Sequence, residues 1–564
     1  MKHMVTVFAV AAVLPQGGFT DAVWSLCGIF AAVYLAFKGK NCLPAPIMAI
    51  MPAAIIIYAG SALYHGLPFE SLAVVGRLMV ICLLLLSFHN MDADVRETAF
   101  VAGMVVAAIG FAAFCGVLSW PGAVASRRLQ SVFQYSNAAG LYLGVAAFLT
   151  RRHPKRSPYA IFLETALVLT QSTGALLVYA AGWAIYILKN REVRVAPVVL
   201  SLAASFLSAG IIYAIVYYLA VPQLAILIPA ALIAFRNKLS NLLQKAPDTK
   251  WALFAGCAGG LAAVAAMLIT RGLRPLGTYL ERLIQISDGA AVIARYPLGI
   301  GPGAWQFFYR AHQSAPYEAT VLHCGYIGAG VDAGFLAVIA IVLFALYWLR
   351  RQSWDDKCVC VLIVLLHVFM DISFSFLSIV LITAMLISDT LPKKPGAKPV
   401  PLPFRGLLVI PLALLTVVFA SSAVKNSAEW AADSGDATAA ALLERRLVHN
   451  DTGAFLMQMR VGLQTGDHGG LDHAFASMAA PNAEANAIKA RSLIERGSYT
   501  RAAEYSLAAA ELSPHSPAGF MLLEEAVSHL DSEERAAYRE KIFRLETETR
   551  QNPLFAYIQR LEGG

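Results

Sequence analysis

The chain has 564 residues, of which 58% are hydrophobic and only 14% are charged, whereas soluble globular proteins carry about 25% charged residues. This composition and the mean hydropathy of +0.61 exclude soluble multidomain, disordered, collagen-like, coiled-coil and disulfide-scaffold proteins, and they predict a multi-pass membrane protein. The net charge of +8 does not indicate nucleic-acid binding, because the basic residues form short patches between apolar runs rather than one basic face with interleaved aromatics.

About fifteen apolar stretches approach the length of about twenty residues that a membrane span needs. In chain order they lie near residues 4–15, 22–37, 43–60, 72–88, 98–119, 137–150, 159–172, 174–188, 195–219, 222–235, 252–270, 326–349, 358–371, 374–390 and 404–424. Several are short, so the sequence predicts an all-α polytopic helix bundle of about 12–15 spans over residues 1–424.

The basic patches predict the orientation of these spans. If the N-terminus is cytoplasmic, every patch falls on the cytoplasmic side, as the positive-inside rule requires. The patches comprise Lys38 and Lys40; Arg151, Arg152, Lys155 and Arg156; Lys189, Arg191 and Arg194; Arg236 and Lys238; Arg350, Arg351 and Lys357; and Lys393, Lys394 and Lys398. Residues 61–71, 120–136, 271–325 and 425–564 then face outward.

The last segment, 425–564, is rich in Ala, Glu and Arg with amphipathic helical periodicity, which predicts an extracytoplasmic α-helical domain suited to binding a protein partner. A window near 483–516 places a glycine, an aromatic residue, two alanines and a proline where a tetratricopeptide repeat of about 34 residues has them. These residues are Gly497, Tyr499, Ala502, Ala509 and Pro514. An irregular helical bundle is the alternative, since a stable solenoid needs about three repeats.

The long outward loop, 271–325, is basic against the positive-inside trend, which indicates an anionic ligand. Its arginines are Arg271, Arg274, Arg282, Arg295 and Arg310. The segment YPLGIGPGAW supplies a glycine turn that lacks the GxxxxGK of a phosphate-binding P-loop, so by itself it favours a structural turn. Aromatic residues follow, and His323 stands directly before the next apolar run.

An isolated histidine usually packs in a core or lies in solvent. At a membrane boundary among arginines, however, His323 is a candidate general base, because the unperturbed imidazole pKa of about 6.5 suits proton transfer near neutral pH. His312 is the next candidate. Arginine forks bind phosphate oxygens, so the loop chemistry fits attack by a hydroxyl on a phosphate-activated donor.

Other charged residues occur near the outward ends of the predicted spans. Arg127 and Arg128 lie in the 120–136 loop, and Arg77 lies about one turn inside an apolar run. Arg77 is either functional or extends to the outer interface. For three acidic residues in or at spans, helix–helix pairing is the favoured interpretation: Glu164, Asp332 and Asp371. The eight cysteines mostly lie in apolar runs and indicate neither a disulfide framework nor a zinc site.

Four segments together, RLQSVFQYSNAAG, LTQSTGALL, ERLIQISDGAAVIARYPLGIGPGAW and LHCGYIGAGVDAGFLAVI, resemble the O-antigen ligase and O-antigen polymerase superfamily. They extend over residues 127–345. The likeness is to ligase-like members that carry a C-terminal tetratricopeptide domain. The remainder of the chain matches only in hydropathy and domain order.

This resemblance implies a glycosyltransferase of the bacterial cytoplasmic membrane, which moves a glycan from an undecaprenyl-diphosphate donor to an acceptor hydroxyl outside. By position, His323 would be the base, Arg282 and Arg128 would bind the diphosphate, and Asn137 would match the family's asparagine at the start of a span. Asp332 matches an acidic residue that follows the histidine. The resemblance implies no metal and no cofactor.

The sequence departs from the family pattern in two places. Ser172, Thr173 and Gly174 stand where the family often has Ser-Arg-Gly, and Arg77 or Arg271 are candidates to replace the missing arginine. Cys324 follows the histidine where Asn or Ser is common.

Ligase and polymerase remain alternatives, because the acceptor could be a lipid, a protein or a growing glycan. A transporter or flippase of a lipid-linked glycan and a non-catalytic scaffold are further alternatives. Transporters often show inverted repeats, and no convincing internal repeat is apparent in this sequence.

Overall fold

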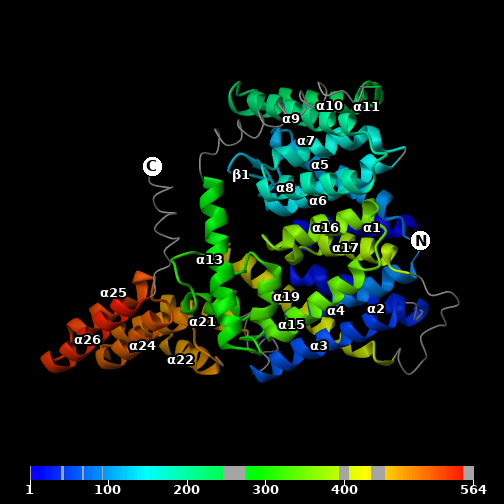
Figure 1. Ribbon diagram of the computed structural model, residues 1–564. Helices are drawn as coiled ribbons and strands as arrows, with labels where there is room; N and C mark the ends of the chain where they lie inside the picture. Colours follow the sequence, from blue (N-terminus) through cyan, green and yellow to red (C-terminus); the bar gives the residue numbers. More distant parts are fainter. Residues whose placement is uncertain are drawn as a thin grey trace. The chain divides into compact units, whose positions relative to one another are not determined.

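The protein folds almost entirely into α-helices, as the computed structural model in Figure 1 shows. The structure describes residues 2–39, 43–65, 69–91, 93–153, 155–245, 274–392, 406–433, 451–478 and 480–549. This part of the chain contains 23 α-helices and one two-stranded ladder, formed by β1 (Val124–Ala125) and β2 (Arg128–Leu129). The predicted all-α class is therefore confirmed.

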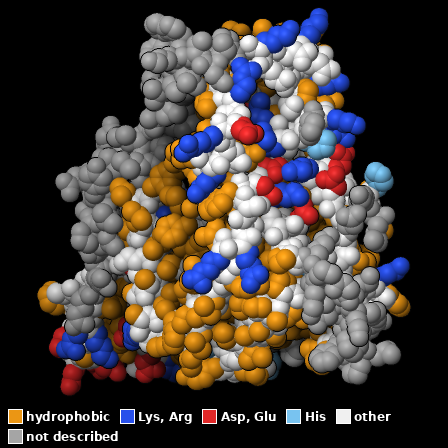
Figure 2. Space-filling view, turned by 45° about the vertical axis from the view of Figure 1, so that its right-hand side comes forward, with side chains coloured by type: hydrophobic (Ala, Val, Ile, Leu, Met, Phe, Trp, Pro, Cys, Tyr) orange, Lys and Arg blue, Asp and Glu red, His pale blue; other side chains and the backbone are white. Residues whose placement is uncertain are grey.

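Seven helices in the described ranges are long and apolar enough to cross a membrane. They are α2 (Asp21–Lys38), α3 (Ala45–Tyr64), α4 (Phe69–Asn90), α5 (Val95–Phe114), α9 (Val195–Tyr217), α15 (Gly325–Leu349) and α19 (Val409–Asp433). Many of their apolar side chains are exposed, such as Phe37 at 78% and Ile56 at 69%. Figure 2 shows broad areas of hydrophobic side chains on one face. Such surfaces are stable in lipid, so these helices indicate a multi-pass membrane protein.

The other apolar stretches form shorter elements. They are α1 (Lys2–Val13), α6 (Ser136–Arg152), α7 (Ala160–Leu169), α8 (Thr173–Lys189), α10 (Leu227–Ala234), α16 (Asp356–Val368) and α17 (Leu377–Thr390). At about 1.5 Å per residue they are shorter than the apolar layer of about 30 Å. The segment η4 (Pro222–Ile226) with α10 is bent by 63° from α11 (Arg236–Lys245), and this pair counts as an eighth candidate span. The stretch 252–270 lies outside the described residues.

The chain divides into two compact units. The first unit comprises Met1–Ile50, Met79–Leu276 and Leu343–Val409, and the second comprises Met51–Leu78, Gly277–Val342 and Ile410–Gly564. The predicted boundary at residue 424 falls inside α19, which continues to Asp433. The apolar run ends near residue 424, but helix-forming residues such as Ala and Lys follow it, so the helix does not end with the hydropathy.

The core of the first unit is built around α6, which is buried along nearly its whole length. Figure 1 shows α5 to α9 as adjacent helices, and α6 packs against α5, α7, α8 and α16. Small residues permit this close packing: a β-carbon at Gly103 of α5 would lie 2.6 Å from the Ala146 side chain of α6. Close approach of helices at small residues is typical of membrane bundles.

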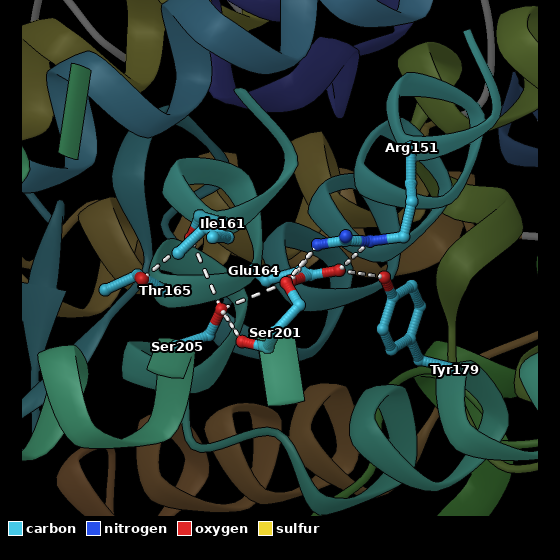
Figure 3. Close-up of polar contacts among 7 residues, drawn as sticks. All are labelled: Arg151, Ile161, Glu164, Thr165, Tyr179, Ser201 and Ser205. Carbon is cyan, nitrogen blue, oxygen red and sulfur yellow. Dashed lines mark hydrogen bonds and ion pairs between the residues drawn. The ribbon is translucent and has the colours of Figure 1, made fainter. Parts of the chain in front are cut away.

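A buried ionic network joins four helices of this core (Figure 3). Glu164 of α7, 1% exposed, pairs with Arg151 of α6 at 2.8 Å and accepts hydrogen bonds from three hydroxyls. The donors are Tyr179 of α8 and Ser201 and Ser205 of α9. The helix–helix pairing predicted for Glu164 is confirmed.

The second unit contains the amphipathic helix α13 (Arg274–Arg295) and the loop that follows it. The loop forms α14 (Trp305–Phe308) and η5 (Tyr309–Ala311), and its aromatic side chains pack with Ile284, Val292 and Val331 in one apolar cluster. The indole of Trp305 donates a hydrogen bond to the Ala319 carbonyl. The 271–325 loop is thus a folded element over its described residues.

The tail of the second unit consists of successive helix pairs joined by short turns. The helices are α21 (Thr452–Thr465) with α22 (His468–Ser477), α23 (Ala483–Glu495) with α24 (Tyr499–Glu511), and α25 (Pro517–Ser528) with α26 (Ser532–Glu548). The turn between α23 and α24 uses Gly497 in the left-handed region, at φ +72, where glycine has no steric penalty. Phe307 of the loop packs against the apolar cluster of α21 to α23.

The remaining 3-10 turns lie between helices of the first unit: η1 (Gln16–Gly18), η2 (Ser131–Phe133), η3 (Ser157–Tyr159) and η6 (Ser373–Ser375).

Candidate functional site

His323 lies two residues before α15, half-buried, at the end of the loop in the second unit. Its Nδ1 is 3.0 Å from Oε1 of Gln285 on α13, and its backbone N–H also donates to this oxygen, at 3.4 Å. Gln285 itself is 1% exposed. A buried side chain on a helix therefore fixes the orientation of the imidazole.

The Gln285 amide is in turn oriented by Glu281, one helical turn earlier. Its Nε2 donates to Glu281 Oε1 at 3.1 Å, which directs Oε1 toward the histidine. Since an amide oxygen only accepts, Nδ1 of His323 must carry the proton, and Nε2 is the basic nitrogen of the neutral ring. The chain Glu281–Gln285–His323 selects one tautomer, as the carboxylate does in a Ser-His-Asp triad.

Arg282 is on the same face of α13 as Gln285, because residues three apart lie one above the other on a helix. It is half-buried, and its guanidinium lies 6.0 Å from the centre of the Tyr279 ring. Arg282 thus lies about one helical turn along α13 from Gln285, the residue that contacts His323. Arg271 lies outside the described residues.

The glycine turn of the loop is anchored to the start of α15. Gly299, Gly301 and Gly303 all have positive φ, at +82, +102 and +75, which explains their identity. Asp332 Oδ1 accepts a hydrogen bond from the Gly303 N–H at 3.0 Å. The turn predicted from these glycines is present, and the contacts of Asp332 join it to a helix.

The turn fits a break in α15 at Gly334, whose backbone is not helical (φ +76, ψ −174). A β-carbon at Gly334 would lie 2.0 Å from the Pro297 carbonyl oxygen, so only glycine fits there. Ser61 of α3 donates to the carbonyls of Leu298 and Asp332, and Ser71 of α4 donates to that of Pro302. The loop that ends in His323 therefore rests on a rigid support.

Arg77 of α4 also lies in the second unit, half-buried, and its charge interacts electrostatically with Asp332. This interaction between α4 and α15 supports the interpretation that Asp332 pairs one helix with another. The same interaction gives Arg77 a partner near the glycine turn.

His312 occupies a different environment in the same loop. Its ring lies 5.9 Å from that of Tyr296, and burial together with the Arg295 charge lowers its pKa. Nearby, Asp288 accepts hydrogen bonds from the Ser314 N–H and the Tyr317 hydroxyl. Burial and the Asp288 charge raise the pKa of Tyr317, so this hydroxyl stays protonated as a structural donor.

The first unit holds the other predicted residues, Arg128 and Asn137. A tight turn with positive φ at Ser126 and Arg127 joins β1 to β2 and presents Arg128. Arg128 donates to the Thr170 carbonyl at 2.9 Å and to Asn137 Oδ1 at 3.0 Å. Asn137 Nδ2 donates in turn to Asp371 at 2.6 Å.

Asp371 is 1% exposed and also accepts from the Tyr135 hydroxyl at 2.8 Å. Asn137 therefore links a buried carboxylate to an arginine. Arg128 also donates to the Gln171 carbonyl at 3.4 Å. Its hydrogen bonds therefore join the segment RLQSVFQYSNAAG to the segment LTQSTGALL, two of the four that carry the family resemblance.

Sequence reasoning missed Glu281 and Gln285 as site residues and treated Asp371 only as a pairing residue. One feature of the sequence could have indicated Gln285 as a site residue: it lies three residues after Arg282 in an amphipathic helix, and therefore on the same face. No local signal could pair it with His323, 38 residues away.

In the ranges that the structure describes, no group of three or more His, Cys, Asp or Glu side chains is arranged to hold a metal ion. The sequence matches no protein-family model, and no curated protein is significantly similar to it.

Proposed function

We propose that this protein is a membrane glycosyltransferase that transfers a glycan from a lipid-diphosphate donor to an acceptor hydroxyl, as an O-antigen ligase or a polysaccharide polymerase does. The observation that carries this proposal is the 3.0 Å contact of His323 Nδ1 with the buried Gln285, itself bonded to Glu281, on the helix that also carries Arg282. An imidazole that is oriented by a helix which also carries an arginine suits deprotonation of a hydroxyl next to an anionic leaving group.

In the proposed step, Nε2 of His323 takes the proton of the acceptor hydroxyl while its oxygen attacks the anomeric carbon. The bond from that carbon to the diphosphate oxygen breaks, and the lipid diphosphate leaves with the electron pair. Arg282 would stabilise the negative charge of the leaving group. Arg128, held by Asn137, is the arginine that the first unit offers for binding a phosphate. A single displacement inverts the anomeric configuration.

The test is transfer by the purified full-length chain in liposomes that contain an undecaprenyl-diphosphate-linked glycan and an acceptor. A new glycosidic bond, identified by mass spectrometry, is the expected result. Movement of the donor across the bilayer without a new bond would establish a transporter instead. If no acceptor class gives either a new bond or movement of the donor, the proposal is overturned and the non-catalytic scaffold remains as the alternative.

Gln285→Leu tests the orientation of His323 and is expected to lower the transfer rate about tenfold or more, since the tautomer is no longer selected. Gln285→Glu keeps an acceptor for Nδ1–H and should restore much of the rate. Because the added carboxylate favours the protonated imidazole, the acidic, ascending limb of the pH–rate profile should move to higher pH. Ser287→Ala, exposed on the same helix, is the control. A Gln285→Leu enzyme with an unchanged rate and pH profile would refute this role.

The second candidate function is transport of a lipid-linked glycan. It is favoured by the buried Arg151–Glu164 pair inside the helix bundle and by the break of α15 at Gly334, because ionisable residues and interrupted helices in spans are common in transporters. The liposome assay separates this function from glycan transfer.

Three finer features belong to the proposal. About 12–15 spans would require the shorter helices, such as α6 and α8, to cross the membrane as well. The first helices of the tail pairs begin at Thr452, Ala483 and Pro517, close to the tetratricopeptide period of about 34 residues, which supports a repeat-type domain that binds a protein or an acceptor. The large loop and the tail would face outward from a bacterial cytoplasmic membrane.

A further inference from the structure

A cavity of about 550 Å³ lies in the first unit, away from the Arg128–Asn137 group of the same unit. It is bounded by the end of α6, η3 and the start of α7, the end of α8, the start of α9, and α11. Asn137 and Arg152 are near opposite ends of α6, which places them roughly 22 Å apart at about 1.5 Å per residue. The cavity is therefore a separate site from the Arg128–Asn137 group.

Three arginines line this cavity: Arg151, Arg152 and Arg194. Arg151 is already paired with the buried Glu164 at 2.8 Å, so its charge is largely balanced. Arg152 and Arg194 are exposed, and among the described residues that line the cavity the acidic side chain is Glu192. These lining residues carry more positive than negative charge, which favours an anionic ligand.

The exposed arginines are held in place by neighbouring groups. Arg152 lies over the ring of Tyr186, 5.0 Å from its centre, and Arg194 donates to the Gln244 carbonyl of α11 at 2.7 Å. Tyr186 and Trp183 are buried and form an aromatic wall. Ser240 of α11 adds a hydroxyl to the lining. Guanidinium and hydroxyl donors beside an apolar wall suit a phosphate that is attached to a hydrophobic group.

The α11 wall has the character of a helix that lies in a membrane interface. Its sequence, RNKLSNLLQK, combines basic residues with three leucines, and none of its side chains is fully buried. Leu242 is 68% exposed, and the helix turns by 63° from the apolar segment before it. Basic amphipathic helices of this kind bind anionic lipid surfaces.

We propose that this cavity binds the phosphate headgroup of an anionic membrane phospholipid, with Arg152 and Arg194 as the phosphate ligands and the lipid chains beside α11. This site is independent of the proposed glycan transfer. It assigns to the 151–156 and 189–194 basic patches a ligand in addition to their topological role.

The test measures lipid binding to the full-length protein in detergent by native mass spectrometry, with added phosphatidylglycerol, phosphatidylcholine or inorganic phosphate. The protein should bind phosphatidylglycerol in preference to phosphatidylcholine, and inorganic phosphate should not displace it. The double variant Arg152→Gln/Arg194→Gln should weaken phosphatidylglycerol binding about tenfold or more.

The matched control is Arg350→Gln/Arg351→Gln, which removes the same charge from two exposed arginines of the first unit that do not line the cavity. It should bind phosphatidylglycerol as the wild type does. Equal loss in both variants would show a diffuse surface charge, and displacement by inorganic phosphate would show a soluble ligand; either result overturns the proposal. Unchanged binding by the Arg152/Arg194 variant would overturn it as well. Thermal midpoints of both variants verify that they are folded.

Discussion

Alanine at position 323 is expected to reduce glycan transfer by about 10²- to 10⁴-fold, the contribution typical of a general base. The imidazole is half-buried and is held by Gln285 through Nδ1, so its loss removes the proton acceptor from an otherwise supported site. The neighbouring glycine turn does not depend on it, because its contacts involve Asp332, Ser61 and Ser71. Transfer is measured in liposomes with the lipid-diphosphate donor, together with the thermal midpoint of the purified variant.

The matched control is His312→Ala in the same loop. His312 packs beside Tyr296, and burial and the Arg295 charge lower its pKa. A lower pKa makes His312 a weaker proton acceptor, so His312→Ala is expected to change transfer little. If the His323→Ala enzyme is as active as the wild type, His323 is not the base. If His312→Ala alone abolishes transfer in a folded protein, the role belongs to His312.

Replacing Glu164 by leucine is expected to destabilise the first unit by about 3–5 kcal/mol, because it leaves the Arg151 charge buried without its partner. Arg151 contacts both carboxylate oxygens, and Tyr179 and Ser201 lose the carboxylate as their acceptor at the same time. The measurement is the thermal midpoint in detergent, which should fall strongly.

Two further variants isolate the cause of this loss. In Arg151→Leu/Glu164→Leu both charges are absent, and most of the stability should return, since a buried ion pair contributes little over apolar packing. Glu525→Gln removes an exposed pair with Arg491, whose side chains are about 40% accessible, and should cost only about 0–1 kcal/mol. A Glu164→Leu midpoint equal to that of the wild type would show that Arg151 is not effectively buried.

The local features of the fold followed from the sequence. Hydropathy predicted the seven long apolar helices, because each needs only its own run of side chains to be stable in lipid. Three glycines in eight residues predicted a turn, and each has the positive φ that favours glycine. The number of spans did not follow from hydropathy, because helices of 10–17 residues are as apolar as spans but are short for the bilayer.

The candidate site was only partly predictable. The position of His323 before an apolar run, and of Arg282 in an amphipathic segment, is visible in the sequence. Its hydrogen bond to Gln285 and the support of the glycine turn by Ser61 and Ser71 join residues between 38 and 237 positions apart, with no local pattern to reveal them.

By itself, therefore, the sequence determined that the chain is a helical membrane protein and which residue types stand in the 271–325 loop, because hydropathy and helical period act over short distances. Only the tertiary structure decided which polar groups meet: Gln285 with His323, Asn137 with Asp371, and Arg151 with Glu164. A buried polar group must find a partner wherever the packing of the helices brings one. The pairing with Gln285 orients the His323 imidazole. Arg151, paired with Glu164, lines the basic cavity at the C-terminal end of α6.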